Sequence, residues 1–273
     1  MKHALRNPLA LIGFSNITAI LLLALIAPWI APYDPNAINV KAILLAPETN
    51  HWMGTDGLGR DVLSRMLYGG RISLLVGFVA VGIATLIGIV LGAVAGFYRG
   101  WVDTVIMRTV DVMLSIPTFF LILAVIAFLT PSIWNIMIVI GLTSWMGVTR
   151  LVRAEFLSLR NREFVLAAQA LGAKDARLIF THLLPNSLTP IIVSSILGIA
   201  SAVLVESGLS FLGLGVQAPQ ASWGNILTDG KEYIQFAWWL SLFPGLAILL
   251  TVLGYNLLGD GLRDAYNPRS NQN

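Results

Sequence analysis

Long apolar runs cover most of this sequence, and they constrain its fold more than any other feature does. They lie at Leu9–Ala31, Ile72–Tyr98, Thr104–Leu129, Ile133–Thr149, Ser187–Leu209 and Trp238–Leu258. About 20 helical residues cross a hydrocarbon core of about 30 Å, and backbone groups in lipid must pair within their own segment. Hydrophobic residues make up 56% of the chain and charged residues only 11%, unlike a soluble domain. The sequence therefore predicts an all-α membrane protein with six transmembrane helices.

The positions of Lys and Arg predict how these helices are oriented, because short cytoplasmic segments are enriched in both. With the N-terminus inside, the outside segments hold only five of the 17 Lys and Arg residues: Lys41, Arg60, Arg65, Arg71 and Lys231. We therefore expect both ends of the chain in the cytoplasm. The first apolar run is longer than the core of a signal peptide and lacks a clear cleavage site, so we expect it to remain as an anchor.

A polar, helix-forming segment, Phe164–Pro185, lies between the fourth and fifth apolar runs. The first half of this segment contains three small residues, which predict a helix of small diameter: Ala167, Ala168 and Ala170. Gly172 can take the left-handed conformation of a turn, and a second helix is expected to begin near Asp175 and to end at Pro185. The pattern predicts a cytoplasmic helix-turn-helix to which a partner could dock. An ordinary connecting hairpin is the alternative.

The spacing within this segment resembles the cytoplasmic signature of permease subunits of ATP-binding-cassette (ABC) importers. That signature runs Glu-Ala-Ala, three residues, Gly, nine residues, Ile, any residue, Leu-Pro; Leu166 stands here in place of the Glu and His182 in place of the Ile. The residues that match are Ala167, Ala168, Gly172, Leu184 and Pro185. The resemblance implies an ATPase contact that also includes Ala173 and Arg177.

Two further runs resemble one branch of these permeases, the C-type member of the dipeptide, oligopeptide and nickel systems. They are Gly54–Leu74 and Ser210–Leu227, and the resemblance covers nearly everything from His51 to Pro268. It implies a type I ABC importer permease fold with a cytoplasmic coupling helix, in the inner membrane of a prokaryote. It also implies a homologous second permease subunit, cytoplasmic ATPase subunits and an external substrate-binding protein as partners.

The expected organisation has three parts. Residues 1–71 form the anchor helix and an external amphipathic segment, residues 72–260 form the permease core with its coupling loop at 150–186, and residues 261–273 form a cytoplasmic tail. In the external segment the apolar side chains at one helical face are Val62, Leu63, Met66 and Leu67, whereas Asp61, Ser64 and Arg65 face away. This pattern favours a helix that lies along the membrane surface.

Small residues recur at every fourth position of the second run: Ala80, Ala84, Gly88, Gly92 and Gly96. Such a row lets a second helix approach closely, either within the chain or on a neighbouring subunit. Two prolines within apolar runs, Pro117 and Pro244, are expected to bend their helices, because each removes a backbone donor and clashes with the preceding turn.

Ionisable residues in a membrane span are candidates for function by default. Asp111 lies near the cytoplasmic end of the third run, and its structural alternative is pairing with Arg108 or with a cation of a neighbouring subunit. Glu206 lies well inside the fifth run, and we expect it to border the translocation pathway in a strip with its neighbours Ser207, Ser210 and Gly213. A structural hydrogen bond would explain Glu206 equally well.

The chain lacks the residues that several activities require. The chain has no G-x-x-x-x-G-K-S/T loop for ATP, no cysteine, and only three histidines, His3, His51 and His182, which lie far apart. No span offers a convincing nucleophile and base pair, and no basic stripe with exposed aromatic residues suggests nucleic-acid binding. We therefore expect a chain that is not an enzyme and holds no metal or cofactor, with ATP and Mg²⁺ on partner subunits.

The sequence and the resemblance together indicate the membrane-spanning subunit of an ATP-driven importer of peptides, nickel or a related small solute. The alternative from another class is a secondary transporter or channel that an ion gradient drives. That alternative would use an intramembrane carboxylate such as Glu206 as a proton site and would need no ATPase.

Overall fold

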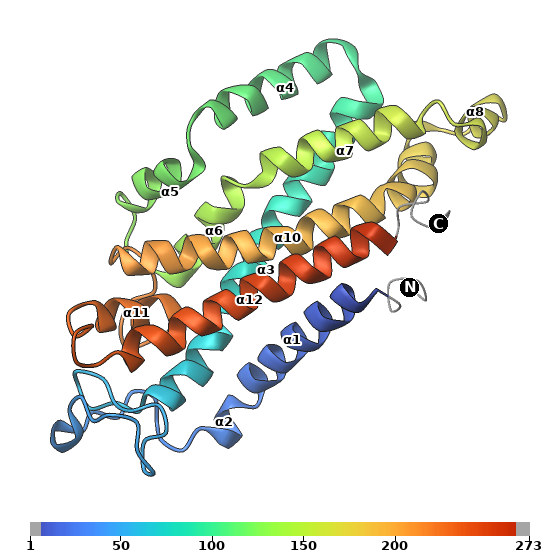
Figure 1. Cartoon of the computed structure of the whole chain (residues 1–273). Helices are drawn as coiled ribbons and strands as arrows, with labels where there is room; N and C mark the ends of the chain where they lie inside the picture. The colour runs from blue at the N-terminus through green and yellow to red at the C-terminus, as the bar shows by residue number, and fades with distance from the viewer. Residues whose placement is uncertain (1–6, 266–273) are drawn as a thin grey trace.

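The computed structural model describes residues 7–265, and this part of the chain is a helical bundle (Figure 1). It contains no β-strand and one isolated β-bridge, between Thr55 and Asp61. Five helices are long and apolar enough to span a membrane, or six if one sharply bent pair counts as a single span. The predicted all-α membrane fold is confirmed. Lys2, Arg6 and the last part of the expected tail, 266–273, lie outside the described residues.

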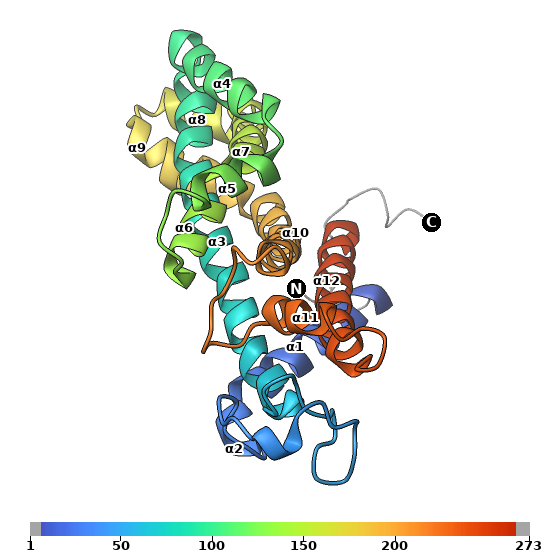
Figure 2. The ribbon, with the colours of Figure 1, turned by 90° about the vertical axis from the view of Figure 1, so that its left-hand side faces the viewer.

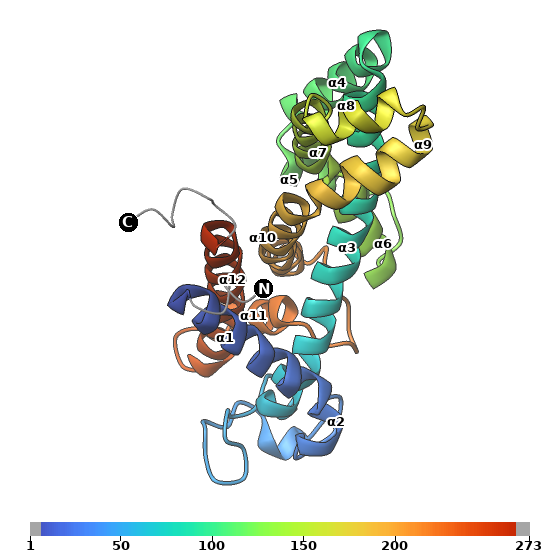
Figure 3. The same cartoon turned by 90° about the vertical axis from the view of Figure 1, so that its right-hand side faces the viewer.

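The elements follow one another in a simple order. They are α1 (Pro8–Leu25), α2 (Ala27–Ile30), η2 (Val40–Ala42), α3 (Val62–Tyr98), α4 (Gly100–Ser115), α5 (Thr118–Ile126), α6 (Ile133–Leu142), α7 (Trp145–Leu159), α8 (Glu163–Ala170), α9 (Asp175–Arg177), η3 (Leu178–Leu183), α10 (Leu184–Phe211), α11 (Trp223–Lys231) and α12 (Trp239–Ala265). Figures 1 and 3 show α8 and α9 at one end of the bundle and the segment between α2 and α3 at the opposite end. The start of α1 and the end of α12 lie toward the α8 end.

Helix α3 is 37 residues long and joins the expected amphipathic segment to the second span without a break. Asp61 caps it by accepting a hydrogen bond from the Ser64 backbone N–H at 2.8 Å. The prediction that Asp61, Ser64 and Arg65 form the outward, polar side of a helix along the membrane surface is wrong, because all three are buried. All three have hydrogen-bond partners within the protein, which is the condition under which buried polar groups are tolerated.

The third predicted span is broken at Pro117, as expected from its ring and missing donor. Helices α4 and α5 meet there at an angle of 82°, and Figure 2 shows α5 turning back toward α6. Pro244 behaves differently, since α12 runs through it without interruption. The expected partner of Asp111 is also different: its carboxylate accepts a hydrogen bond from Arg150 of α7 at 2.5 Å, rather than from Arg108.

The row of small residues on α3 lies against α7 and α6. A Cβ atom on Gly92 would lie 2.6 Å from the Thr149 carbonyl oxygen, and one on Gly96 would lie 2.7 Å from the Phe156 Cβ. Each of the five positions, Ala80, Ala84, Gly88, Gly92 and Gly96, is buried. In this chain the close approach is therefore an internal contact, and it fixes the distance between the two helices.

Candidate functional site

The turn between α8 and α9 has the hydrogen bonds of a Schellman motif. The Ala173 N–H donates to the Ala168 carbonyl oxygen at 3.0 Å and the Gly172 N–H to that of Gln169 at 2.9 Å. Gly172 has a φ of +79°, in the left-handed region that favours glycine. Ala168 and Ala173 both pack against one apolar cluster, which places the hydrophobic positions of this motif on the same side of the turn. The predicted turn at Gly172 is confirmed.

The second limb of this hairpin begins at Asp175, as predicted, but it does not end at Pro185. Helix α9 continues through the wide π-helical turns of η3 directly into α10, which ends at Phe211. Pro185 lies in the first turn of α10, where a proline is tolerated, and the π turns before it accommodate the missing donor. The hairpin is therefore one end of a membrane-spanning helix.

The inner face of the hairpin is anchored on the ends of α3 and α7. Val165, Leu178 and Leu183 are buried in a cluster with Phe97 and Phe156. Arg160 adds a polar tie, because its guanidinium donates to the Phe97 carbonyl oxygen at 2.5 Å. This anchoring sets the position of the hairpin relative to the spans.

The outer face of the hairpin is unusually apolar for an exposed surface. Leu171 is 89% exposed, Phe180 68% and Leu166 50%. Among the predicted coupling residues, Ala167, Gly172, Arg177 and Pro185 are exposed, whereas Ala168, Ala173 and Leu184 are half-buried against the anchoring cluster. Exposed apolar patches with a polar rim mark interaction sites. We name the surface formed by Leu166, Ala167, Leu171, Arg177 and Phe180 the docking face.

Sequence reasoning missed three members of the docking face, Leu166, Leu171 and Phe180. The signal was present, because large apolar side chains in a polar loop between two spans have no core to enter unless a partner supplies it. In the sequence alone, however, these residues cannot be told from Val165 and Leu178, which do enter the core.

The strip around Glu206 is enclosed within the chain. Glu206 has no exposed surface, and Ser207 and Ser210 are also buried. Its carboxylate accepts hydrogen bonds from the Ser73 hydroxyl of α3 at 3.2 Å and from the Ser210 hydroxyl at 2.8 Å. Gly213, with a φ of +80°, is the one predicted strip residue with open space around it.

The hydrogen bonds of this strip continue into the segment before α11. Ser210 Oγ accepts from the Val216 N–H at 3.1 Å, and Ser73 Oγ accepts from the Trp223 N–H at 3.2 Å. A Cβ on Gly224 would lie 2.6 Å from that of Ser210, so α11 approaches α10 closely. The network joins α3, α10 and α11, and a role for Glu206 in the translocation pathway stays a prediction.

A second polar cluster lies at the end of the bundle opposite the hairpin. Asp56 is buried and binds the guanidinium groups of Arg60, at 2.7 Å, and Arg65. Both arginines also reach Asp229 of α11, at 3.2 Å and 2.8 Å. Burial by itself would raise the pKa of Asp56, but the charge of Arg65, the hydrogen bond from the Arg60 N–H and the charge of Arg60 outweigh it and hold that pKa below its usual value. We call these four residues the external ion cluster, after the side of the membrane that the distribution of Lys and Arg predicts for this end of the bundle.

Two hollows lie along α10. One of about 740 Å³ lies between α7, α10 and the end of α12. Its polar lining residues are Glu155, Thr189, Ser194 and Arg263. A smaller one of about 230 Å³ lies deeper between α3, α6, α7 and α10, where the hydroxyl groups of Thr85 and Ser195 are 2.9 Å apart. Gly147 and Ser194 belong to both linings. Among residues 7–265, no group of three His, Cys, Asp or Glu residues is arranged to hold a metal ion.

Comparison with known families gives two matches, which leave residues 48–87 between them. Residues 88–272 match the family described as "Binding-protein-dependent transport system inner membrane component". Residues 1–47 match the "N-terminal TM domain of oligopeptide transport permease C".

Three bacterial proteins are similar to this chain over most of their length. The dipeptide transport system permease protein DppC of Alkalihalophilus pseudofirmus is 46% identical, over 98% of this chain and 88% of that protein. The probable D,D-dipeptide transport system permease protein DdpC of Escherichia coli is 44% identical, over 97% and 89%. The oligopeptide transport system permease protein OppC of Bacillus subtilis is 39% identical, over 96% and 86%.

A similar fold occurs in a chain of the MetNI methionine ABC transporter, solved in inward-facing conformations. The TM-score is 0.61 at 17% sequence identity, over 73% of this chain and 95% of that chain. At this identity the likeness concerns the arrangement of the helices alone.

Proposed function

This chain belongs to the family of binding-protein-dependent transport system inner membrane components, and from that premise we propose that it is the membrane-spanning subunit of an ATP-driven peptide importer. Its fold is the predicted type I ABC importer permease fold. The relatives that are 39–46% identical are named as dipeptide or oligopeptide permeases, which favours a peptide over nickel as the substrate. The proposed partners are a homologous second permease, cytoplasmic ATPase subunits that bind ATP and Mg²⁺, and an external substrate-binding protein.

The observation that carries this proposal is the docking face on a helix that continues across the membrane. Leu171 and Phe180 are exposed on a hairpin whose other side is firmly anchored. A partner that covers these side chains would remove apolar surface from water, and helix α10 would carry its movement to the opposite end of the bundle. In our proposal, closure of the ATPase pair moves the docking face and so opens the pathway alternately to each side.

Co-purification with the ATPase subunits tests the docking face directly. We expect Leu171→Asp and Phe180→Asp to reduce recovery of a nucleotide-binding subunit with this chain and to abolish transport-coupled ATP hydrolysis. Leu58→Asp is the matched control, because Leu58 is 46% exposed at the opposite end of the bundle. Full recovery of ATPase subunit and full uptake in both hairpin variants would contradict the proposal.

The wall of the pathway is proposed to be the larger hollow along α7 and α10. Thr189, Ser194, Glu155 and Arg263 give this surface polar and charged groups, and such groups in or beside a span are costly against lipid. Single cysteines can be introduced freely, since the chain has none. We expect a cysteine at Ser194 to react with a small polar reagent in the assembled transporter and peptide substrate to slow the reaction. A cysteine at Leu86, 67% exposed on α3, is the lipid-facing control.

We also propose that both termini and the hairpin are cytoplasmic, as the distribution of Lys and Arg predicts. In intact cells an impermeant thiol reagent should label a cysteine at Asn50 and not one at Lys174, two exposed positions at opposite ends of the bundle. The reverse pattern would invert this topology.

A further inference from the structure

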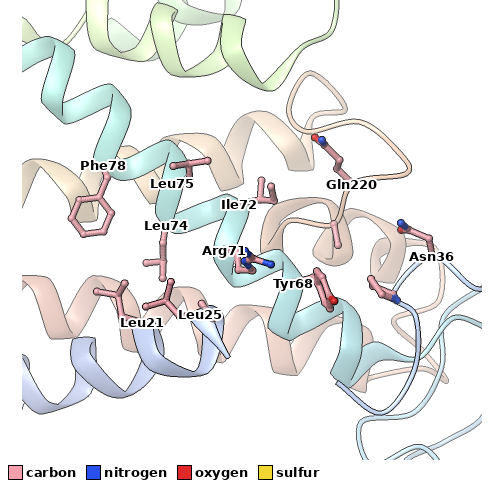
Figure 4. A pocket seen from close by; sticks show the side chains of 13 residues that line it. Leu21, Leu25, Asn36, Tyr68, Arg71, Ile72, Leu74, Leu75, Phe78 and Gln220 are labelled. Carbon is pink, nitrogen blue, oxygen red and sulfur yellow. The ribbon is translucent and has the colours of Figure 1, made fainter. Parts of the chain in front are cut away.

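A hollow of about 480 Å³ lies between α1, α3 and the segment before α11, away from the hairpin and from the two hollows along α10 (Figure 4). One end of it is apolar, with Leu21, Leu74 and Phe78. The other end is polar, with Asn36 and Gln220. Figure 4 shows Arg71 and Tyr68 between the two ends. The lining is therefore amphipathic along its length.

Arg71 supplies the only formal charge of this lining. Its side chain is exposed, and among the described residues no carboxylate lies within 4.0 Å of it. Its guanidinium lies 5.9 Å from the centre of the Tyr68 ring, so the aromatic face supports the cation without neutralising it. A guanidinium in this setting is suited to bind a phosphate group in two-point contact.

The depth of Arg71 follows from its neighbours on α1. A Cβ on Gly70, one residue before, would lie 3.6 Å from that of Ala24, which is in the last turn of α1. Helix α1 has 18 residues, which at 1.5 Å per residue is close to the thickness of a hydrocarbon core of about 30 Å. Its last turn, and Arg71 beside it, therefore lie where hydrocarbon meets headgroups, while Leu74 and Phe78 lie one and two turns deeper.

We propose that this hollow binds an anionic phospholipid of the leaflet that faces away from the hairpin. The phosphate of the lipid contacts Arg71. Asn36 and Gln220 lie near the glycerol and the headgroup, and one acyl chain lies along Leu74 and Phe78. Charge and depth together favour this occupant, because a cation at the boundary next to an apolar channel matches a headgroup with its attached chain. A lipid at this place would join α1 to α3 and to the segment before α11.

Native mass spectrometry of the full-length chain, with whatever subunits co-purify, tests the proposal in nanodiscs of dioleoyl phosphatidylglycerol or dioleoyl phosphatidylcholine. We expect the wild type to retain phosphatidylglycerol in preference, and Arg71→Gln to weaken that retention about five-fold, the effect of one cation near an anionic headgroup. Arg71→Lys should keep most of the preference. Lys41→Gln removes an exposed charge from the same end of the bundle and should change nothing.

The apolar part of the site has its own test. Leu75 is 43% exposed on the lining, so Leu75→Trp should fill the channel and weaken retention of both lipids alike. Unchanged phosphatidylglycerol retention in Arg71→Gln would overturn the proposal, and so would displacement of the lipid by inorganic phosphate alone. Efficient cross-linking of a cysteine at Leu75 to another subunit would also overturn it, since a protein helix would then fill the hollow.

Discussion

The two ends of the helical bundle are held together by different forces. At the external end, Asp56, Arg60 and Arg65 are buried, and they tie the segment before α3 to α11 through Asp229. At the other end the hairpin is anchored chiefly by apolar contacts, and Leu171 remains almost fully exposed. The external end pairs its buried charges within the chain, whereas the hairpin end presents apolar side chains that a partner can cover.

This difference indicates which end can change its contacts. Breaking a buried ion pair leaves a charge without a partner, which is strongly unfavourable, so the external ion cluster holds one arrangement. The hydrophobic effect is non-directional, so apolar side chains can shift against one another, or be covered by a partner, at a small cost in free energy. We therefore expect substitutions at the external end to act on stability and substitutions at the hairpin to act on coupling.

The largest effect is expected from Asp56→Ala. This change leaves Arg60 and Arg65 buried with only the half-exposed Asp229, and loss of one partner from a buried ion pair costs about 3–5 kcal/mol. The free energy of unfolding, or the thermal midpoint of the purified chain in detergent, measures it. Glu48→Gln is the control, because Glu48 is exposed in the same external segment. Equal stability of the two variants would remove the contrast between the ends.

The external ion cluster should also produce an acid sensitivity. The pKa of Asp56 in the folded chain lies below its unfolded value of about 3.9. The ionised carboxylate therefore stabilises the fold fully at pH values above the unfolded pKa, and this stabilisation is lost as the pH falls through the lower pKa of the folded chain. Stability of the wild type should therefore fall below about pH 4. A pH series of thermal midpoints should show a smaller fall for Asp56→Asn. If the wild type and Asp56→Asn lost stability equally in acid, the Asp56 carboxylate would not be a source of the acid sensitivity.

A smaller loss of stability is expected at the contact between α3 and α7. In Gly92→Val the new Cβ would lie 2.6 Å from the Thr149 carbonyl oxygen and 2.7 Å from the Val152 Cβ, and such overpacking typically costs about 1–3 kcal/mol. Gly82→Val makes the same change on the same helix at a site with no atom within 4 Å. The difference between their unfolding free energies isolates the helix contact.

Gly172→Val should separate coupling from stability. Its Cβ has open space, but φ is +79°, and a β-branched residue in the left-handed region costs roughly 1–2 kcal/mol. We expect the turn to change shape locally, with ATP hydrolysis no longer coupled to uptake and the thermal midpoint nearly unchanged. Gly172→Asn should retain coupling, since Asn tolerates this conformation. A large fall in global stability instead would mean that the hairpin belongs to the rigid part of the protein.

The smallest effect is expected from Glu206→Gln. The amide keeps the shape of the side chain, but its single oxygen can accept from only one of Ser73 and Ser210, which donate to different carboxylate oxygens, so we expect stability to change by about 1 kcal/mol. Uptake normalised to purified complex should be unchanged if Glu206 is a structural link between α3, α10 and α11. A fall in normalised uptake at unchanged stability would support the prediction that this residue borders the pathway.

The spans could be predicted from the sequence because apolar length alone decides them, and Gly172 because few other residues adopt its backbone conformation. The burial of Arg65 could not be predicted. Helical periodicity places Arg65 opposite Met66 and Leu67, and its partner Asp229 lies 164 residues away in the sequence. The prediction that a helix ends at Pro185 is wrong for a related reason: whether a proline ends a helix depends on the turns before it, and the π turns of η3 have no recognisable residue pattern.

The uninterrupted helix from Asp175 to Phe211 gives the chain the mechanics of a lever. Its 37 residues correspond to about 55 Å at 1.5 Å per residue, and most of that length lies between the hairpin and Glu206. The carboxylate of Glu206, bonded to α3 close to the far end, would then act as a pivot, so a large sideways displacement at the hairpin would become a small one near Phe211. The wide turns of η3 are the most compliant part of the shaft. Stiffening them would let more of a movement at the hairpin reach Glu206, so the displacement at Phe211 would grow for the same movement of the hairpin.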